Sequence, residues 1–129
     1  MACADRHRVG IAGGVKFLTH DGSAFLIREA RPRAQKFGTI QVGDNVFIGE
    51  NALILPGTVI GSGCIIGPGA VVRGHIPENS LVFGNPAEIV GRASLHLERL
   101  KHHPNTMETF GLEESERRKK VEAHFRGNA

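Results

Sequence analysis

Residues 42–71 read VGDNVF-IGENAL-ILPGTV-IGSGCI-IGPGAV when they are cut every six residues. A fixed period of this kind indicates a repeat architecture. A series of hairpins would alternate at period two and would not keep one aliphatic position through successive hexads. The period therefore predicts a solenoid in which each hexad supplies one short strand and one tight turn, with a large aliphatic residue and a small residue pointing inward. The aliphatic first positions are Val42, Ile48, Ile54, Ile60, Ile66 and Val72, and the fifth positions are Val46, Ala52, Thr58, Cys64, Ala70 and Ile76.

The same register appears before the repeat, at Ile11 and Phe17, so residues 19–39 are expected to be a loop inserted into a coil. We predict a mainly β solenoid domain over residues 5–91 and a helical C-terminal extension over residues 92–129. The outward residues that precede the aliphatic positions are also apolar, and we expect them to form one stripe along a face, as at an interface. They are Phe47, Leu53, Val59, Ile65 and Val71.

The extension is polar and predicts two helices. The first covers residues 94–103, begins at Ser94 and has a thin apolar stripe of Leu97 and Leu100. The second covers residues 111–125, with acidic residues at its start and basic residues later, which suits the helix dipole. The extension is expected to cap the solenoid, to pack on a neighbouring subunit or to stay partly disordered.

Composition restricts the class of protein. The chain has 129 residues, 17 glycines, no Trp or Tyr and a net charge of +3. The N-terminal residues lack the apolar core of a signal peptide, and no apolar run is long enough to span a membrane. Cys3 and Cys64 are too few for a disulfide framework, so a reduced, cytoplasmic setting is expected. The charge pattern does not indicate nucleic-acid binding.

Three stretches resemble the hexapeptide-repeat acyltransferases, and the resemblance covers residues 9–92. They are VGDNVFIGENALILPG in the repeat, HIPENSLVFGNPAEIV at its exit and KFLTHDG before the insertion. The likeness is greatest to the branch that O-acetylates sugars and capsular or surface polysaccharides. It implies a left-handed parallel β-helix, acetyl-CoA as acyl donor, no metal, and a homotrimer with active sites between adjacent solenoids. Family members have further coils or a helical cap before this region, so the chain is expected to be a minimal enzyme, a fragment or a solenoid with weakened activity.

The KFLTHDG stretch makes His20 the candidate catalytic residue. Acetyl transfer from a thioester to a hydroxyl needs a base that takes the hydroxyl proton, and a neutral imidazole does this near physiological pH. The plainer alternative is a solvated loop histidine. Asp21 follows, and its carboxylate either fixes the imidazole tautomer, contacts substrate or simply favours a turn.

The resemblance also implies a cofactor groove, although several positions depart from the family pattern. Glu50 stands where Ser is frequent, Pro68 lacks the N–H that is often aimed at the pantetheine arm, and Glu88 replaces a basic residue. Arg73 and Arg92 are available for the phosphates of the cofactor, or are ordinary exposed cations. The expected groove residues are Phe47, Glu50, Gly67, Pro68, Arg73, Gly74 and Arg92.

The insertion is basic over residues 28–36, REARPRAQK. It contacts an acidic or phosphorylated sugar acceptor, for which Arg28 is the candidate, or it is a solvated arm that packs on a neighbouring subunit. Other histidines are weaker candidates: His75 fits a solenoid corner, and the spacing of His102, His103 and His124 matches no common zinc pattern. Carbonic anhydrases with this fold need three zinc histidines, which are not found around His20. Two further readings stay open, an N-acyltransferase on an amino sugar and a non-catalytic assembly module.

Overall fold

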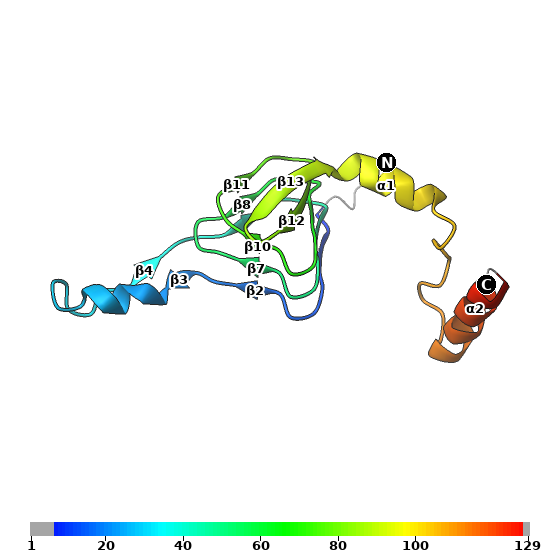
Figure 1. The fold of residues 1–129 in the computed structure, drawn as a ribbon, viewed down its shortest axis with the longest axis horizontal. Coiled ribbons are helices and arrows are strands. Elements are labelled where there is room, and N and C mark those ends of the chain that lie inside the picture. The colour runs from blue at the N-terminus through cyan, green and yellow to red at the C-terminus, as the bar shows by residue number, and fades with distance from the viewer. Residues whose placement is uncertain (1–6, 128–129) are drawn as a thin grey trace. The chain divides into compact units, whose positions relative to one another are not determined.

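The computed structural model describes residues 7–127, so Cys3 and the first two residues of the predicted domain lie outside the described residues. One compact unit extends to Glu98 and a second begins at Arg99. The first unit is a parallel β-helix with a protruding arm (Figure 1). The repeat therefore forms the solenoid that its period predicts.

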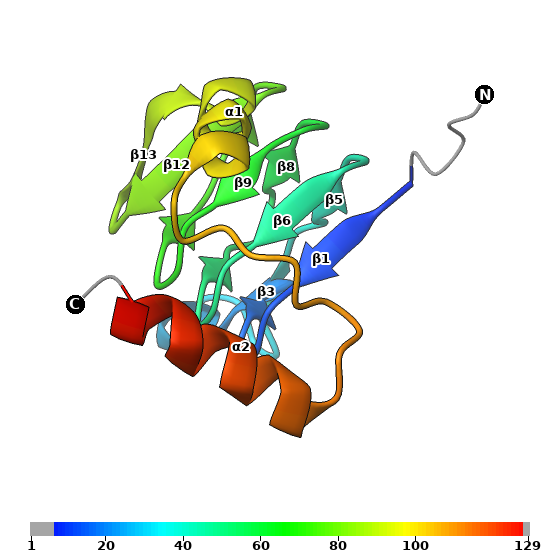
Figure 2. The ribbon, with the colours of Figure 1, turned by 90° about the vertical axis from the view of Figure 1, so that its right-hand side faces the viewer.

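Three short parallel sheets make the three sides of the β-helix, and Figure 2 shows the strands of the first sheet side by side. Successive strands along the chain belong to successive sheets, and β13 alone is antiparallel to its neighbour within the first sheet. The first sheet contains β1 (Val9–Ile11), β6 (Val46–Ile48), β9 (Ile65–Ile66), β12 (Ser80–Gly84) and β13 (Ala87–Arg92). The second contains β2 (Lys16–Phe17), β7 (Leu53–Ile54) and β10 (Val71–Val72), and the third β5 (Gln41–Val42), β8 (Val59–Ile60) and β11 (His75–Ile76).

The aliphatic first positions form the core, as predicted. Five of them, Ile48, Ile54, Ile60, Ile66 and Val72, are at most 1% exposed. Burial of each such side chain contributes about 1.5–3 kcal/mol. The small fifth positions fill the space beside the corners, and the one hydroxyl among them, on buried Thr58, donates to the carbonyl of Leu55 at 2.6 Å.

The corners between sheets use residues that tolerate a left-handed backbone. The fourth position of the hexads has a positive φ, from 55° to 86°, where glycine and asparagine are least strained. These residues are Gly14, Asn45, Asn51, Gly57, Gly63, Gly69 and Asn79. At the second position the next coil passes very close: a Cβ on Gly49 would lie 2.7 Å from the backbone nitrogen of Pro68.

The last coil departs from the hexad rule, and the prediction for Ile76 is wrong. Ile76 lies at an aliphatic first position, stacked on Ile60 in the third sheet, although it follows Val72 by four residues. Gly74, with a φ of 79°, makes this tighter corner possible. The chain then resumes its spacing of six, so that Val82 stacks on Ile66.

The outward apolar residues do not form the single stripe that we predicted. Phe47 and Ile65 share the first sheet, Leu53 and Val71 the second, and Val59 lies on the third. The reason is the three-sided coil, because residues six apart fall on successive faces. Each face therefore carries only one or two of them.

The insertion leaves the corner between the second and third sheets, which we call the second corner. We define the arm as residues 20–37. It contains β3 (His20–Asp21), the short 3₁₀ helix η1 (Gly22–Ile27) and β4 (Lys36–Phe37), with β3 and β4 paired antiparallel. At its base, Gly38 N donates to the carbonyl of Thr19 at 2.9 Å, so both ends of the arm are fixed to the solenoid.

Two α-helices follow the solenoid, as the sequence predicts. α1 (Ala93–His102) begins one residue before Ser94, because the Asn79 side chain accepts from Ser94 N at 2.8 Å and so caps the helix. α2 (Glu114–Gly127) has Glu114 in its first turn and Arg126 in its last, the expected charge order. No helix in the described residues is both long enough and apolar enough to span a membrane.

Candidate active site

An open hollow of about 580 Å³ lies where the arm leaves the second corner. Its floor is apolar and comes from two stacked coils, with Leu18 in one and Leu55 and Pro56 in the next. Its wall comes from the base of the arm. The full lining is Leu18, His20, Asp21, Gly22, Lys36, Phe37, Gly38, Leu55, Pro56, Gly57 and Arg73.

His20 is held by the pairing of β3 with β4, where it lies opposite Phe37. The two ring centroids are 6.1 Å apart and the rings are tilted by 42°. His20 is exposed, and within the described part of the chain no hydrogen-bond partner holds its imidazole. Its ring is therefore positioned by the backbone and by Phe37, while a ring nitrogen is open to a bound molecule.

Asp21 follows His20 and accepts hydrogen bonds from Ser23. Its Oδ1 accepts from Ser23 N at 2.9 Å and from Ser23 Oγ at 2.6 Å, which caps η1. The bonds from the Ser23 side chain and backbone lower the pKa of the Asp21 carboxyl, and the charges of Lys36 and His20 lower it further. Of the alternatives left open by the sequence, these bonds favour the turn; the prediction of a substrate contact stays a prediction.

Arg73 is the predicted cofactor residue that reaches this hollow. It follows Val72 at the second corner, in register with Leu55 and Leu18 of the coils beside it. Gly74 comes next, with the left-handed backbone of the short corner. The structure thus brings one cation from the solenoid to the same cavity as the imidazole.

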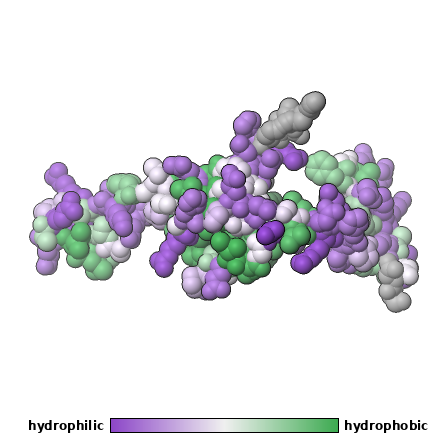
Figure 3. Space-filling model, turned by 90° about the horizontal axis from the view of Figure 1, so that it is seen from above, coloured by the Kyte–Doolittle hydropathy of each residue, from purple (hydrophilic) through white to green (hydrophobic). Residues whose placement is uncertain are grey.

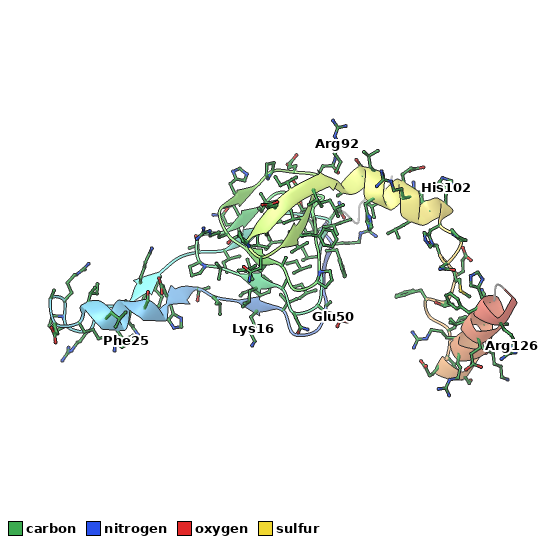
Figure 4. All side chains as sticks on the ribbon, in the orientation of Figure 1. Lys16, Phe25, Glu50, Arg92, His102 and Arg126 are labelled. Atoms are coloured by element: carbon green, nitrogen blue, oxygen red, sulfur yellow. The ribbon has the colours of Figure 1, made fainter. Side chains whose placement is uncertain are left out.

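Most other predicted groove residues lie elsewhere in the chain. Glu50, Gly67 and Pro68 belong to the first corner, between the first and second sheets, and the carbonyl of Glu50 accepts from Gly69 N at 2.8 Å. In Figure 4, Glu50 lies on the side of the solenoid away from the arm. Phe47 lies in the first sheet and points outward, with its ring against Gly10.

Arg92 and Arg28 also lie outside the hollow. Arg92 ends β13 and is exposed. Arg28 lies in the arm, where its Nε donates to the carbonyl of Ala34 at 3.3 Å, so its guanidinium braces the arm internally. Within one chain, therefore, His20, the candidate base, and most of the predicted groove residues are separated by a side of the β-helix.

Comparison with known proteins gives a consistent family. Residues 39–74 match the model for the bacterial transferase hexapeptide, six repeats. Protein CapG of Staphylococcus aureus is 45% identical over 82 residues, which are 64% of this chain and 48% of that protein. Residues 39–74 thus contain the repeat of the bacterial hexapeptide transferases, and the β-helix is similar to the hexapeptide-repeat acyltransferases. Its solenoid is accordingly of the left-handed kind.

Solved structures agree with this family. A maltose O-acetyltransferase from Clostridium difficile is similar with a TM-score of 0.57 and 32% identity, over 65% of this chain and 44% of that one. A hexapeptide-repeat acetyltransferase from Vibrio cholerae, complexed with acetyl coenzyme A, has a TM-score of 0.56 and 26% identity, over 66% and 47%. The chain thus spans about half the length of the relatives it matches.

Two aromatic residues near these positions were missed by sequence reasoning. Phe37 forms the wall beside His20, and it could have been found because the two ends of an insertion must meet at its base. Phe83 lies over Gly67, where an added Cβ would be 2.3 Å from its ring. No feature of the sequence indicates the position of Phe83, because this position depends on the short corner that precedes it.

Among residues 7–127, no three His, Cys, Asp or Glu side chains form a group that could hold a metal ion. His75 is exposed on the outer face of the third sheet, and His103 accepts from Asn105 N within its own turn.

Proposed function

We propose that this hexapeptide-repeat protein transfers an acetyl group from acetyl-CoA to a hydroxyl of a sugar, with His20 as general base. The observation that carries the proposal is the imidazole in the hollow: it is fixed by β3 and Phe37 and has no protein hydrogen-bond partner among the described residues. The acetyltransferases that the β-helix resembles, one of which is complexed with acetyl coenzyme A, support the same chemistry.

The reaction is a direct transfer. A neutral ring nitrogen of His20 takes the proton as the acceptor oxygen attacks the thioester carbonyl carbon, so that a C–O bond forms. The C–S bond then breaks, and the imidazolium returns the proton to the thiolate that leaves. The apolar floor of the hollow suits the carbon face of a sugar, and Arg73 beside it suits negative charge.

The separated groove residues are brought together if the protein is a homotrimer. In a closed ring of three, the second corner of one chain faces another side of its neighbour. We propose that the first corner of a neighbouring chain, with Glu50, Gly67 and Pro68, supplies the cofactor groove opposite His20. Phe47 and Arg92 would border that groove, and Arg73 would come from the chain that supplies the base.

A screen of acceptors tests the function. The purified chain is incubated with acetyl-CoA and, separately, with neutral sugars, amino sugars and phosphorylated sugars, and release of the CoA thiol is followed with a thiol-reactive dye. A reaction without acceptor corrects for the protein thiols and for plain hydrolysis. We expect thiol release that depends on a sugar hydroxyl, with acetylated product seen by mass spectrometry. Acetylation of the amino group, with amino sugars as the acceptors that react, would make the protein an N-acyltransferase, and no transfer with any acceptor would leave the assembly-module reading.

A further inference from the structure

The arm carries more positive charge than its own carboxylates neutralise. Its cations are Arg28, Arg31, Arg33 and Lys36, against Asp21 and Glu29. Arg28 donates to Ala34 O, and Lys36 lies opposite Asp21 in the paired strands. Arg31 and Arg33 are different, because neither side chain has an ion-pair or hydrogen-bond partner in the described part of the chain.

These two arginines line a second hollow, of about 530 Å³, within the arm. Its lining combines the guanidinium-bearing residues Arg31 and Arg33 with Lys36 and the apolar residues Ile27 and Phe37. Figure 3 shows hydrophilic residues around a hydrophobic patch at the free end of the arm. Guanidinium groups beside apolar residues in such a hollow offer charge-assisted hydrogen bonds to an anionic group.

The second hollow adjoins the one that contains His20. Both are lined by Lys36 and Phe37, so strand β4 is their common wall. A molecule that extends along β4 would place one group beside the imidazole and another beside the arginines. The volumes of the two hollows, about 580 Å³ and 530 Å³, lie in the usual range of small-molecule pockets.

Arg33 also has a backbone conformation that side chains seldom adopt. Its φ is 66°, in the left-handed region where glycine and asparagine are usual. A long cationic side chain at such a position is a departure that points to a task for the side chain. It also provides a useful variant, because glycine fits this backbone without strain.

We infer that the arm binds a phosphate group of the acceptor, so that the acceptor is a sugar phosphate or a nucleotide-linked sugar. This inference rests on the proposed function, because it places the sugar of the same molecule beside His20. Guanidinium groups bind phosphate through paired hydrogen bonds, and two of them match the charge of a phosphate dianion better than that of a single carboxylate. The cofactor also carries phosphates. Three of the predicted groove residues, Glu50, Gly67 and Pro68, lie at the first corner of their own chain, away from the arm, and competition by coenzyme A distinguishes the two ligands.

Binding measured without acetyl-CoA tests the inference separately from the function. Calorimetry compares glucose, glucose 1-phosphate and UDP-glucose at low ionic strength. We expect the wild type to bind the two phosphorylated sugars more tightly than glucose, with affinity that falls as salt is added. The double variant Arg31→Gln/Arg33→Gln should weaken their binding by about tenfold or more, as expected when charge-assisted hydrogen bonds are lost. Arg33→Gly should weaken binding without loss of folding. The matched control is Arg118→Gln/Arg126→Gln in α2, which removes the same charge and should leave binding unchanged.

Several results would overturn the inference while the acetyltransferase proposal stands. These are equal binding of glucose and glucose 1-phosphate, unchanged binding in both arm variants, or competitive displacement of glucose 1-phosphate by coenzyme A, which would assign the hollow to the cofactor. A change of oligomeric state in Arg31→Gln/Arg33→Gln, seen by light scattering, would instead make the hollow a subunit contact. Conversely, phosphate binding that depends on the arm together with no acetyl transfer would overturn the function and leave the anion site.

Discussion

His20 and Asp21 are adjacent in the sequence and have separate roles in the structure. The carboxylate of Asp21 accepts hydrogen bonds from Ser23 and caps η1. His20 precedes this cap and points its imidazole toward Phe37. The sequence placed both residues at a break in the repeat, but it could not separate a capping carboxylate from an orienting one, because aspartate favours both.

The Asp21 cap predicts a local pH dependence. The folded arm lowers the pKa of this carboxyl below its ordinary value of 3.8, so the carboxylate stabilises the arm above that pH and the contribution is lost as the pH falls through the lowered pKa. Carbon NMR of the Asp21 carboxyl should therefore give a midpoint below 3.8, with the Ser23 amide shifting together with it. A midpoint at or above that value would mean that the cap does not form in solution.

Gly49 shows why the repeat keeps glycine at the second position. A Cβ there would lie 2.7 Å from Pro68 N, which is backbone and cannot move aside alone. Gly49→Ala should lower the free energy of unfolding by about 1–3 kcal/mol, as expected for overpacking. The control is Gly13→Ala, since nothing lies within 4 Å of the added Cβ. Equal urea midpoints for the two variants would show that the coils are less closely stacked than described.

At the scale of elements, the period of six was enough to predict the strands and their core residues. It failed at β11, where four residues separate Val72 from Ile76. By the period of six, Ile76 falls at a fifth position, and the sequence alone does not show that it occupies a first position. That assignment needs the neighbouring coil, on which Ile76 stacks. The prediction of a single outward apolar stripe was wrong for a related reason. Residues six apart lie on successive faces of the coil, and the three faces exist only in the folded chain.

We predict that the arm is needed for acetyl transfer and that the stability of the β-helix does not depend on it. Gly38 N and Thr19 O already lie 2.9 Å apart, so residues 20–37 can be replaced by an Asn-Gly turn. We expect the shortened chain to keep the circular dichroism spectrum and the unfolding midpoint of the full chain, and to lose acetyl transfer. Transfer at the original rate without the arm would rule out His20 as the base.

At the scale of the whole molecule, most of the predicted groove residues would need a second chain to come close to His20. His20 is at the second corner, whereas Glu50 and Pro68 are at the first, and one chain does not bring them together. This arrangement could not be read from the repeat, because residues twelve apart look equivalent in the sequence and lie on different sides of the coil. The trimer remains a prediction from the family resemblance.

Mixed subunits test this shared site. His20→Ala removes the base, and Glu50→Trp blocks the first corner through an exposed side chain whose backbone contact stays intact. Each variant alone should be inactive. Trimers refolded from an equal mixture should recover about a quarter of wild-type activity, because random pairing gives that share of interfaces with both parts intact. No recovery in the mixture, although light scattering shows trimers, would place the whole site within one chain.

The identity of the base is the central claim, and one kinetic comparison tests it most directly. His20→Ala and the control His75→Ala, an exposed histidine outside the hollow, are assayed by thiol release with the best acceptor from the screen. We predict that His20→Ala lowers kcat by about a hundredfold or more, the range of general-base catalysis, with an unchanged oligomer, while His75→Ala keeps wild-type turnover. Wild-type turnover in His20→Ala would contradict the account.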